Sequence, residues 1–371
     1  MTNLAIIGGG VIGRSIAYRL AAAKIGTIRV FEQSNEQRGA SFAAAGMVAA
    51  QAEAILHDDD TNLQFNVRAR THLRNFTDEL TQLTHRPIPW WNHGILVVAA
   101  DDIRTRGLGD CAVRQRSLGL RADVIDPLRL MTLEPMLQRN LAGGVLLPDD
   151  SALHTGLYMS ALEAALGRVG VVIEKNVSVH GIELIDDRFR GLRTSTGRMG
   201  FDAAIVCNGA WLSDFLSNIP LRTRIRPTRG QIVEVGGKQD CPRHIVFAPG
   251  CYLVPRQDNT LLIGATMEDV GFDESVTLGG VSGLGTAAAK TLQGVQERPL
   301  LAVRSGLRPM SDDGQPMIGQ VWGIPGLFVA AGHGRDGILT SAITADIMRS
   351  IIADNEVPHW ATHLSPSPRF A

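Results

Sequence analysis

The sequence predicts an α/β protein in which a doubly wound domain carries a second, strand-rich domain inserted into it. Three observations support this fold class. A strand, a glycine turn, a helix and a strand open the chain at 4–32, and a strand, a glycine turn and a helix close it at 327–352. Between them, the stretch 224–267 is rich in short apolar strands. Alternating strands and helices predict a parallel sheet, whereas consecutive strands predict an antiparallel one.

The composition is that of an ordinary globular protein. Hydrophobic residues make up 44% of the 371 residues and charged residues 20%, and the formal net charge is −1. This balance gives no indication of nucleic-acid binding. The four cysteines form no CxxC pair and no histidine cluster accompanies them, so we expect no metal site and a reducing compartment. We expect neither a signal peptide nor a transmembrane segment, and we place the protein in the cytoplasm.

The elements follow from apolar periodicity and from turn residues. Short apolar runs predict strands, an amphipathic pattern predicts a helix over 61–84, and Thr155 is expected to cap a helix that ends near Arg168. The tail 358–371 contains two prolines and is expected to be loosely attached. The other strands are expected at 95–99, 143–147, 171–173, 177–179, 203–207, 231–235, 251–255 and 261–263.

A discontinuous division into two domains follows from this order. Residues 1–84, 155–221 and 300–371 are assigned to a Rossmann-like nucleotide-binding domain, and residues 85–154 and 222–299 to a substrate domain. A ligand bound between two such domains would be shielded from water.

The motif Gly8-x-Gly10-x-x-Gly13 lies between the first strand and the first helix, and Glu32 ends the second strand 19 residues later. Glycines at these positions permit a tight turn and the close approach of a pyrophosphate to the helix N-terminus. Glu32 is placed to accept hydrogen bonds from an adenosine ribose and would repel a 2′-phosphate. FAD or NAD is therefore favoured over NADP.

A second glycine cluster, from Gly332 to Gly337, also joins a strand to a helix. A second helix N-terminus directed at a ligand suits a flavin, because the reduced ring carries negative charge that the helix dipole stabilises. His333 is interpreted as a structural residue of this loop.

Seven segments together resemble the D-amino acid oxidase superfamily, and most closely its glycine oxidase branch. They are Gly-Gly-Gly-Val-Ile-Gly at 8–13, Ala-Ala-Ala-Gly-Met at 43–47, Cys-Asn-Gly-Ala-Trp at 207–211, Cys-Tyr-Leu-Val-Pro-Arg at 251–256, Gly-Ala-Thr-Met at 264–267, Gly-Leu-Arg-Pro at 306–309 and Ala-Gly-His-Gly-Arg-Asp-Gly-Ile at 331–338. The resemblance implies a Rossmann-like FAD-binding domain with an inserted α+β substrate domain built on a large antiparallel sheet.

The resemblance also implies the catalytic residues. Arg308 is expected to grip the substrate carboxylate through its guanidinium fork, and Tyr252 to add a hydrogen bond to the same carboxylate. The main-chain carbonyl of Arg335 is expected to hold the substrate amine, with a purely structural role for this residue left open. Met47 and Met267 are expected to line the substrate side or to pack in the core.

The cofactor residues that the resemblance implies come from the two glycine turns and from segments between them. They are Gly8, Gly10, Val11, Ile12, Gly13, Glu32, Gln33, Ala40, Ser41, Ala45, Gly46, Met47, Val179, Gly209, His333, Gly334, Arg335, Asp336, Gly337, Ile338 and Leu339. Relatives with covalent flavin use a cysteine in the segment matching 305–307, where this chain has Ser-Gly-Leu. FAD is therefore expected to be held non-covalently.

The expected reaction is oxidation of the C–N bond of glycine or another small amino acid or amine by hydride transfer to FAD. Electrons would pass to molecular oxygen, and the imine product would suit thiamine thiazole synthesis. Two alternatives remain open: a D-amino acid dehydrogenase that reduces a quinone or a protein, and a non-catalytic flavin-binding protein. The substrate range and any homo-oligomer also stay open; Gly250, where we expect glycine oxidases to carry a bulkier residue, favours a wider range.

Overall fold

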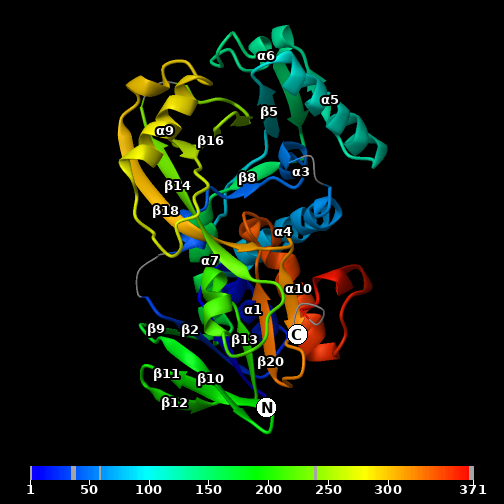
Figure 1. The fold of residues 1–371 in the computed structure, drawn as a ribbon, viewed down its shortest axis with the longest axis vertical. Helices are drawn as coiled ribbons and strands as arrows, with labels where there is room; N and C mark the ends of the chain where they lie inside the picture. The colour runs from blue at the N-terminus through cyan, green and yellow to red at the C-terminus, as the bar shows by residue number, and fades with distance from the viewer. Residues whose placement is uncertain (1, 35–38, 58–59, 238–239, 367–371) are drawn as a thin grey trace.

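The computed structural model describes residues 2–34, 39–57, 60–237 and 240–366. Two large sheets dominate it, a six-stranded one near the chain termini and an eight-stranded one at the other end of the long axis (Figure 1). The α/β fold class is confirmed, with a parallel sheet in one part and a large, mainly antiparallel sheet in the other.

The six-stranded sheet is assembled from the beginning, middle and end of the chain. All neighbouring strands are parallel except β19 and β20, which are antiparallel. Its spatial order is β19 (Met317–Gln320), β20 (Leu327–Ala331), β13 (Ala203–Val206), β1 (Asn3–Ile7), β2 (Thr27–Glu32) and β9 (Val172–Lys175).

Both faces of this sheet are covered, which explains why β1 is apolar at successive positions. Leu4 and Ile6 pack against helices, whereas Ala5 and Ile7 pack against a smaller sheet. The helices are α1 (Val11–Ala22), α4 (Leu63–Thr84), α7 (Thr155–Arg168) and α10 (Gly337–Asp354). The opposite face is covered by β10 (Val179–Ile185), β11 (Arg188–Thr194), β12 (Gly197–Gly200) and α8 (Leu212–Phe215).

The eight-stranded sheet contains one parallel pair, β15 with β5. Helices α5 (Asp102–Ser117) and α9 (Leu278–Ala289) pack on its opposite faces, and α6 (Pro127–Leu133) packs on the same side as α9. Its order is β18 (Leu300–Ser311), β14 (Ile225–Val235), β17 (Leu261–Gly264), β16 (Cys251–Pro255), β15 (Ile245–Ala248), β5 (Ile95–Ala99), β7 (Gly143–Leu147) and β6 (Asp123–Ile125).

Short elements connect the two parts. A three-stranded sheet contains β3 (Met47–Val48), β8 (Ser151–Leu153) and β4 (Trp90–Trp91), and the one-turn helix α2 (Ala40–Ala43) and helix α3 (Ala52–His57) flank β3 in sequence. The 3₁₀ segments are η1 (Gly209–Trp211), η2 (Val295–Glu297) and η3 (His359–Leu364). The predicted division into two domains, with boundaries at 84, 154, 221 and 299, stays our proposal.

Two sequence expectations are wrong. The cap of α7 is His154, whose ring accepts a hydrogen bond from Leu157 N at 3.3 Å, because the Thr155 hydroxyl donates to the Ala44 carbonyl at 3.0 Å instead. The described part of the tail is not loose, since Ala361 and Leu364 of η3 are buried in the core around the helices. Residues 367–371 lie outside the described part.

Candidate active site between the two sheets

A cavity of about 920 Å³ lies between the two large sheets. The loops that follow β1, β2, β13 and β20 form one side, at the carboxyl edge of the parallel strands, where α/β sheets bind ligands. Residues of β14, β16 and β18 form the other side. The volume is at the upper end of the range for small-molecule sites.

The first glycine turn has the geometry that its sequence predicts. Gly8 has a φ of +108°, and a Cβ there would lie 2.5 Å from the Cys207 carbonyl oxygen. A Cβ on Gly13 would lie 2.1 Å from the Gly8 carbonyl oxygen. The turn therefore requires glycine for packing, and it brings the N-terminus of α1 to the cavity with Gly10, which has no side chain, at the N-cap position.

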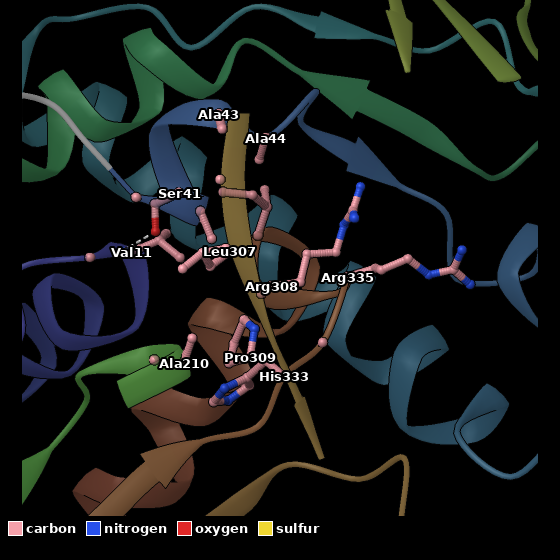
Figure 2. Close-up of a pocket in the computed structure, with 18 of the residues that line it drawn as sticks. Val11, Ser41, Ala43, Ala44, Ala210, Leu307, Arg308, Pro309, His333 and Arg335 are labelled. Carbon is pink, nitrogen blue, oxygen red and sulfur yellow. Dashed lines mark hydrogen bonds between the residues drawn. The ribbon is translucent and has the colours of Figure 1, made fainter. Parts of the chain in front are cut away.

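Glu32 lies at the end of β2 and lines the cavity beside this turn. Its carboxylate accepts hydrogen bonds from Gly9 N at 3.0 Å and from Ser34 N at 3.1 Å. Ser41 contributes from α2, accepting a hydrogen bond from Val11 N at 3.0 Å (Figure 2). Glu32 is thus fixed as an acceptor at the position expected for a ribose hydroxyl.

The second glycine turn brings the N-terminus of α10 to the same cavity. Gly332 and Gly334 have φ of +83° and +55°, and no side chain caps the helix. His333 is buried, its Nε2 lies 3.1 Å from the Thr344 hydroxyl, and burial lowers the pKa of the imidazole to about 3. His333 is therefore neutral at pH 7, and the helix N-terminus supplies the positive potential in this loop.

The polar atoms and the glycines of the cavity fit a bound dinucleotide. Among the described residues, the side-chain oxygen of Asn208 is buried without a hydrogen-bond partner, and Asn208 lines the cavity next to Gly8. Buried polar atoms without partners are uncommon, so this oxygen is available to a ligand donor. A Cβ on Gly306 would lie 2.9 Å from the Ala43 Cβ, so glycine lets β18 pack closely against α2 in this wall of the cavity.

Arg308 and Tyr252 lie together at the other end of the cavity. Arg308, on β18, donates a hydrogen bond to the Thr266 carbonyl at 3.0 Å and approaches the Met267 sulfur at 3.4 Å. Arg308 also interacts with the hydroxyl of Tyr252, on β16, and burial raises the pKa of that phenol to about 12. Within the described part of the chain, no carboxylate lies within ion-pair distance of Arg308.

Two glycines on neighbouring strands make room for this pair. A Cβ on Gly230 would lie 2.3 Å from both Arg308 Nη atoms, and a Cβ on Gly264 would lie 2.5 Å from the Tyr252 hydroxyl. Gly264 is the direct cross-strand partner of Tyr252. Gly230 could not be recognised as a site residue from the sequence, because its role depends on the pairing of β14 with β18.

Arg335 points away from Arg308, toward α3 (Figure 2). Its guanidinium forms an ion pair with Glu53 and contacts the His57 ring, and all three residues line the cavity. Burial raises the pKa of Asp336 to about 7, and its carboxylate accepts a hydrogen bond from Asn66 at 3.0 Å. Glu53 and His57 were missed by sequence reasoning, because α3 carries no motif.

The structure brings most of the predicted site residues together around the cavity. Gly13 and Leu339 do not line it: Gly13 packs beneath the turn, and Leu339 is buried between the helices. The lining includes Gly8, Gly10, Val11, Ile12, Glu32, Gln33, Ala40, Ser41, Ala45, Gly46, Met47, Val179, Gly209, Tyr252, Met267, Arg308, His333, Gly334, Arg335, Asp336, Gly337 and Ile338.

The fold and the cavity define a class of protein, an α/β oxidoreductase with a dinucleotide cofactor. The family model described as FAD dependent oxidoreductase matches residues 3–351, and the chain belongs to this family. FAD is therefore its cofactor.

Sequence and structure comparisons agree on the branch of the family. The chain is 31% identical to a glycine oxidase from Geobacillus kaustophilus (strain HTA426), covering 95% of this chain and 93% of that protein. It is 29% identical to the bifunctional protein ThiO/ThiG of Nostoc sp., covering 97% of this chain but 54% of that protein. The crystal structure of glycine oxidase from Geobacillus kaustophilus superimposes with a TM-score of 0.92 at 30% identity, covering 99% and 98% of the two chains.

No helix in the described part of the chain is both long enough and apolar enough to span a membrane.

Proposed function

We propose that this protein oxidises glycine or another small amino acid to an imine, which water converts to an oxo acid and ammonia. The proposal depends mainly on one observation: Arg308 lies beside Tyr252 in the cofactor cavity and has no carboxylate partner among the described residues. An ionised guanidinium in such a place favours a ligand carboxylate. The glycine oxidase relatives support the same substrate class.

The chain's residues orient and enclose the substrate. Arg308 and Tyr252 hold the carboxylate, and the main-chain carbonyl of Arg335 accepts a hydrogen bond from the neutral amine. Bound FAD supplies the two-electron acceptor, and molecular oxygen takes the electrons onward to give hydrogen peroxide. Fixing the substrate at both its carboxylate and its amine leaves the α-carbon in one orientation, which is the main contribution that a protein makes to such a reaction.

The glycine turns hold FAD in this proposal. Gly8, Gly10 and the N-terminus of α1 take the pyrophosphate, Glu32 takes the ribose, and the turn before α10 lies against the flavin. FAD is bound without a covalent link, since 305–307 contains no cysteine. Denaturation should therefore release free FAD, and flavin that stays with the precipitated chain would contradict this assignment.

An anaerobic flavin-reduction screen tests the reaction. Glycine, sarcosine and small D-amino acids should bleach the flavin, whereas amines without a carboxylate should do so poorly. Oxygen consumption with the same substrates separates an oxidase from a dehydrogenase that reduces a quinone or a protein. A flavin that no amino acid reduces would overturn the proposal and favour a non-catalytic flavin-binding protein.

The similarity to ThiO/ThiG proteins supports a second proposal, that the imine serves thiamine thiazole synthesis in the cytoplasm. The test is growth without thiamine: deletion of the gene should create a requirement that the parent sequence relieves and an Arg308→Ala variant does not. Normal growth of the deletion strain without thiamine would contradict the pathway assignment and leave the reaction assignment intact.

A further inference from the structure

Glu53 places a buried carboxyl group in the substrate end of the cavity, where burial raises its pKa and the nearby Arg335 favours the charged form. It lies in the first turn of α3, and its side chain is 11% exposed. Its carboxylate forms an ion pair with Arg335 and lies 3.6 Å from His57 Nε2. It also interacts electrostatically with Arg308 and Tyr252. These side chains therefore form one charge cluster around the proposed substrate site.

A separate network keeps α3 in this position. The Asp150 carboxylate accepts hydrogen bonds from Gln51 N at 2.9 Å and Ala52 N at 2.8 Å, and it forms an ion pair with Arg70 at 2.9 Å. The Asp150 side chain is fully buried and does not line the cavity. Asp150 therefore fixes the backbone at the start of α3, from which the Glu53 side chain enters the cavity, and breaking these buried hydrogen bonds would be costly.

The charges in this cluster leave one cation for a substrate. Arg335 is neutralised by Glu53, whereas Arg308 has no carboxylate partner in the described part of the chain. Tyr252 is uncharged at pH 7, since a phenol ionises only near pH 10 and burial raises the pKa of this hydroxyl further. A substrate with one carboxylate therefore supplies the partner that Arg308 lacks among the described residues. A second carboxylate would meet Glu53 and find Arg335 already paired, and like charges brought together in an interface are strongly disfavoured.

We infer that Glu53 determines substrate specificity by reserving Arg335, so that the site accepts amino monocarboxylates and rejects amino dicarboxylates. This inference rests on the proposed function, because it assumes that Arg308 binds the first carboxylate. Removing the charge of Glu53 would make Arg335 available to a second substrate carboxylate, such as that of D-aspartate or iminodiacetate. In this scheme Glu53 acts in two ways: it occupies Arg335, and its charge repels a second substrate carboxylate.

The test compares the holoenzymes of the parent, Glu53→Gln and Glu53→Asp. The amide of Glu53→Gln keeps the size of the side chain and an acceptor for Arg335 but removes the charge. The ratio of flavin-reduction efficiency for D-aspartate or iminodiacetate to that for glycine should rise about tenfold or more. Glu53→Asp keeps the charge and should keep the parent's preference. Glu183→Gln is the matched control, because Glu183 pairs with Arg198 outside the cavity and its loss should leave the ratio unchanged.

A binding measurement on the parent protein makes the test independent of how the variants fold. Acetate and malonate are unreactive probes, and their binding is followed by the change in the flavin spectrum. The parent should bind acetate more tightly than malonate, and Glu53→Gln should reverse or remove this preference. A parent that prefers malonate, or a Glu53→Gln protein with the parent's substrate ratio, would overturn the inference. Failure of glycine to reduce the parent flavin would instead overturn the proposed function.

Discussion

Replacement of Arg308 by alanine should remove most of the activity toward amino acids while the flavin site stays intact. The guanidinium contacts Thr266, Met267 and Tyr252, so its loss leaves the cofactor end of the cavity untouched. Removing one member of a buried, hydrogen-bonded charge pair costs about 2–5 kcal/mol. At about 1.4 kcal/mol per factor of ten, kcat/KM for glycine should fall by roughly 30-fold to several-thousand-fold.

Two further variants separate the charge from its geometry. Arg308→Lys should recover only part of the loss, because an ammonium group cannot replace a planar fork of donors. Tyr252→Phe removes one neutral donor and should cost about 1 kcal/mol, a factor of roughly five. Stopped-flow reduction of the flavin without oxygen, at a series of substrate concentrations, measures each effect directly.

A carboxylate-free amine is the substrate control. Ethylamine should be a poor substrate of the parent protein and should lose little in Arg308→Ala, since it has no carboxylate to bind. The visible flavin spectrum should be nearly unchanged in all three variants. If Arg308→Ala oxidises glycine and D-alanine as efficiently as the parent, Arg308 does not bind the carboxylate, and the proposed substrate class loses its main residue-level support.

Three further predictions use other contacts of the cavity. Glu32→Ala should weaken FAD binding by about 1.5–3 kcal/mol for each ribose hydrogen bond lost, and an unchanged Kd in a fluorescence titration would exclude Glu32 as the ribose ligand. Gly230→Ala should displace the Arg308 guanidinium, because its Nη atoms would lie 2.3 Å from the new Cβ. The variant should keep FAD but lose kcat/KM by a factor on the order of 100. Gly283→Ala, with open space around the new Cβ, is the matched control. His333 stays neutral in the folded protein because burial lowers the pKa of its ring from 6.5 to about 3. Below pH 6.5 the ring binds a proton in the unfolded chain but not in the folded one, so the free energy of unfolding falls as the pH falls. In His333→Gln, urea unfolding between pH 4.5 and 6.5 should show a pH slope smaller by up to about 1.4 kcal/mol per unit, whereas parallel slopes for the two proteins would contradict a neutral buried imidazole.

The parts of the fold that could be predicted are those with local causes. The turns after β1 and β20 were predicted because positive φ and close packing demand glycine there, as at Gly8 and Gly332. Strands β5, β7 and β16 have the predicted bounds, because each is a short apolar run between turn residues. In these segments the sequence within a few residues is sufficient to choose the conformation.

The elements that were not predicted depend on distant contacts. Helix α9 contains four glycines and has little helical propensity; it forms because Thr277 caps it and because Leu284 and Ala288 pack against the eight-stranded sheet. Strand β18 is exposed along much of its first half and has no clear alternation, and its pairing with β14 along eleven positions fixes it as a strand. Neither cause is visible within a short window of sequence.

The charged residues of the site also divide into those that motifs in the sequence identify and those that depend on distant contacts. Arg308 and Arg335 stand in motifs that could be recognised from the sequence, but the motifs alone do not show whether the Arg335 side chain is available to a substrate. In the folded structure Glu53 pairs with Arg335 inside the cavity. Its placement depends on α3, which Asp150 and Arg70 hold from other parts of the chain. The residues proposed to bind the cofactor and the first carboxylate therefore follow from motifs, whereas Glu53, proposed to limit the substrate to one carboxylate, follows only from the folded structure.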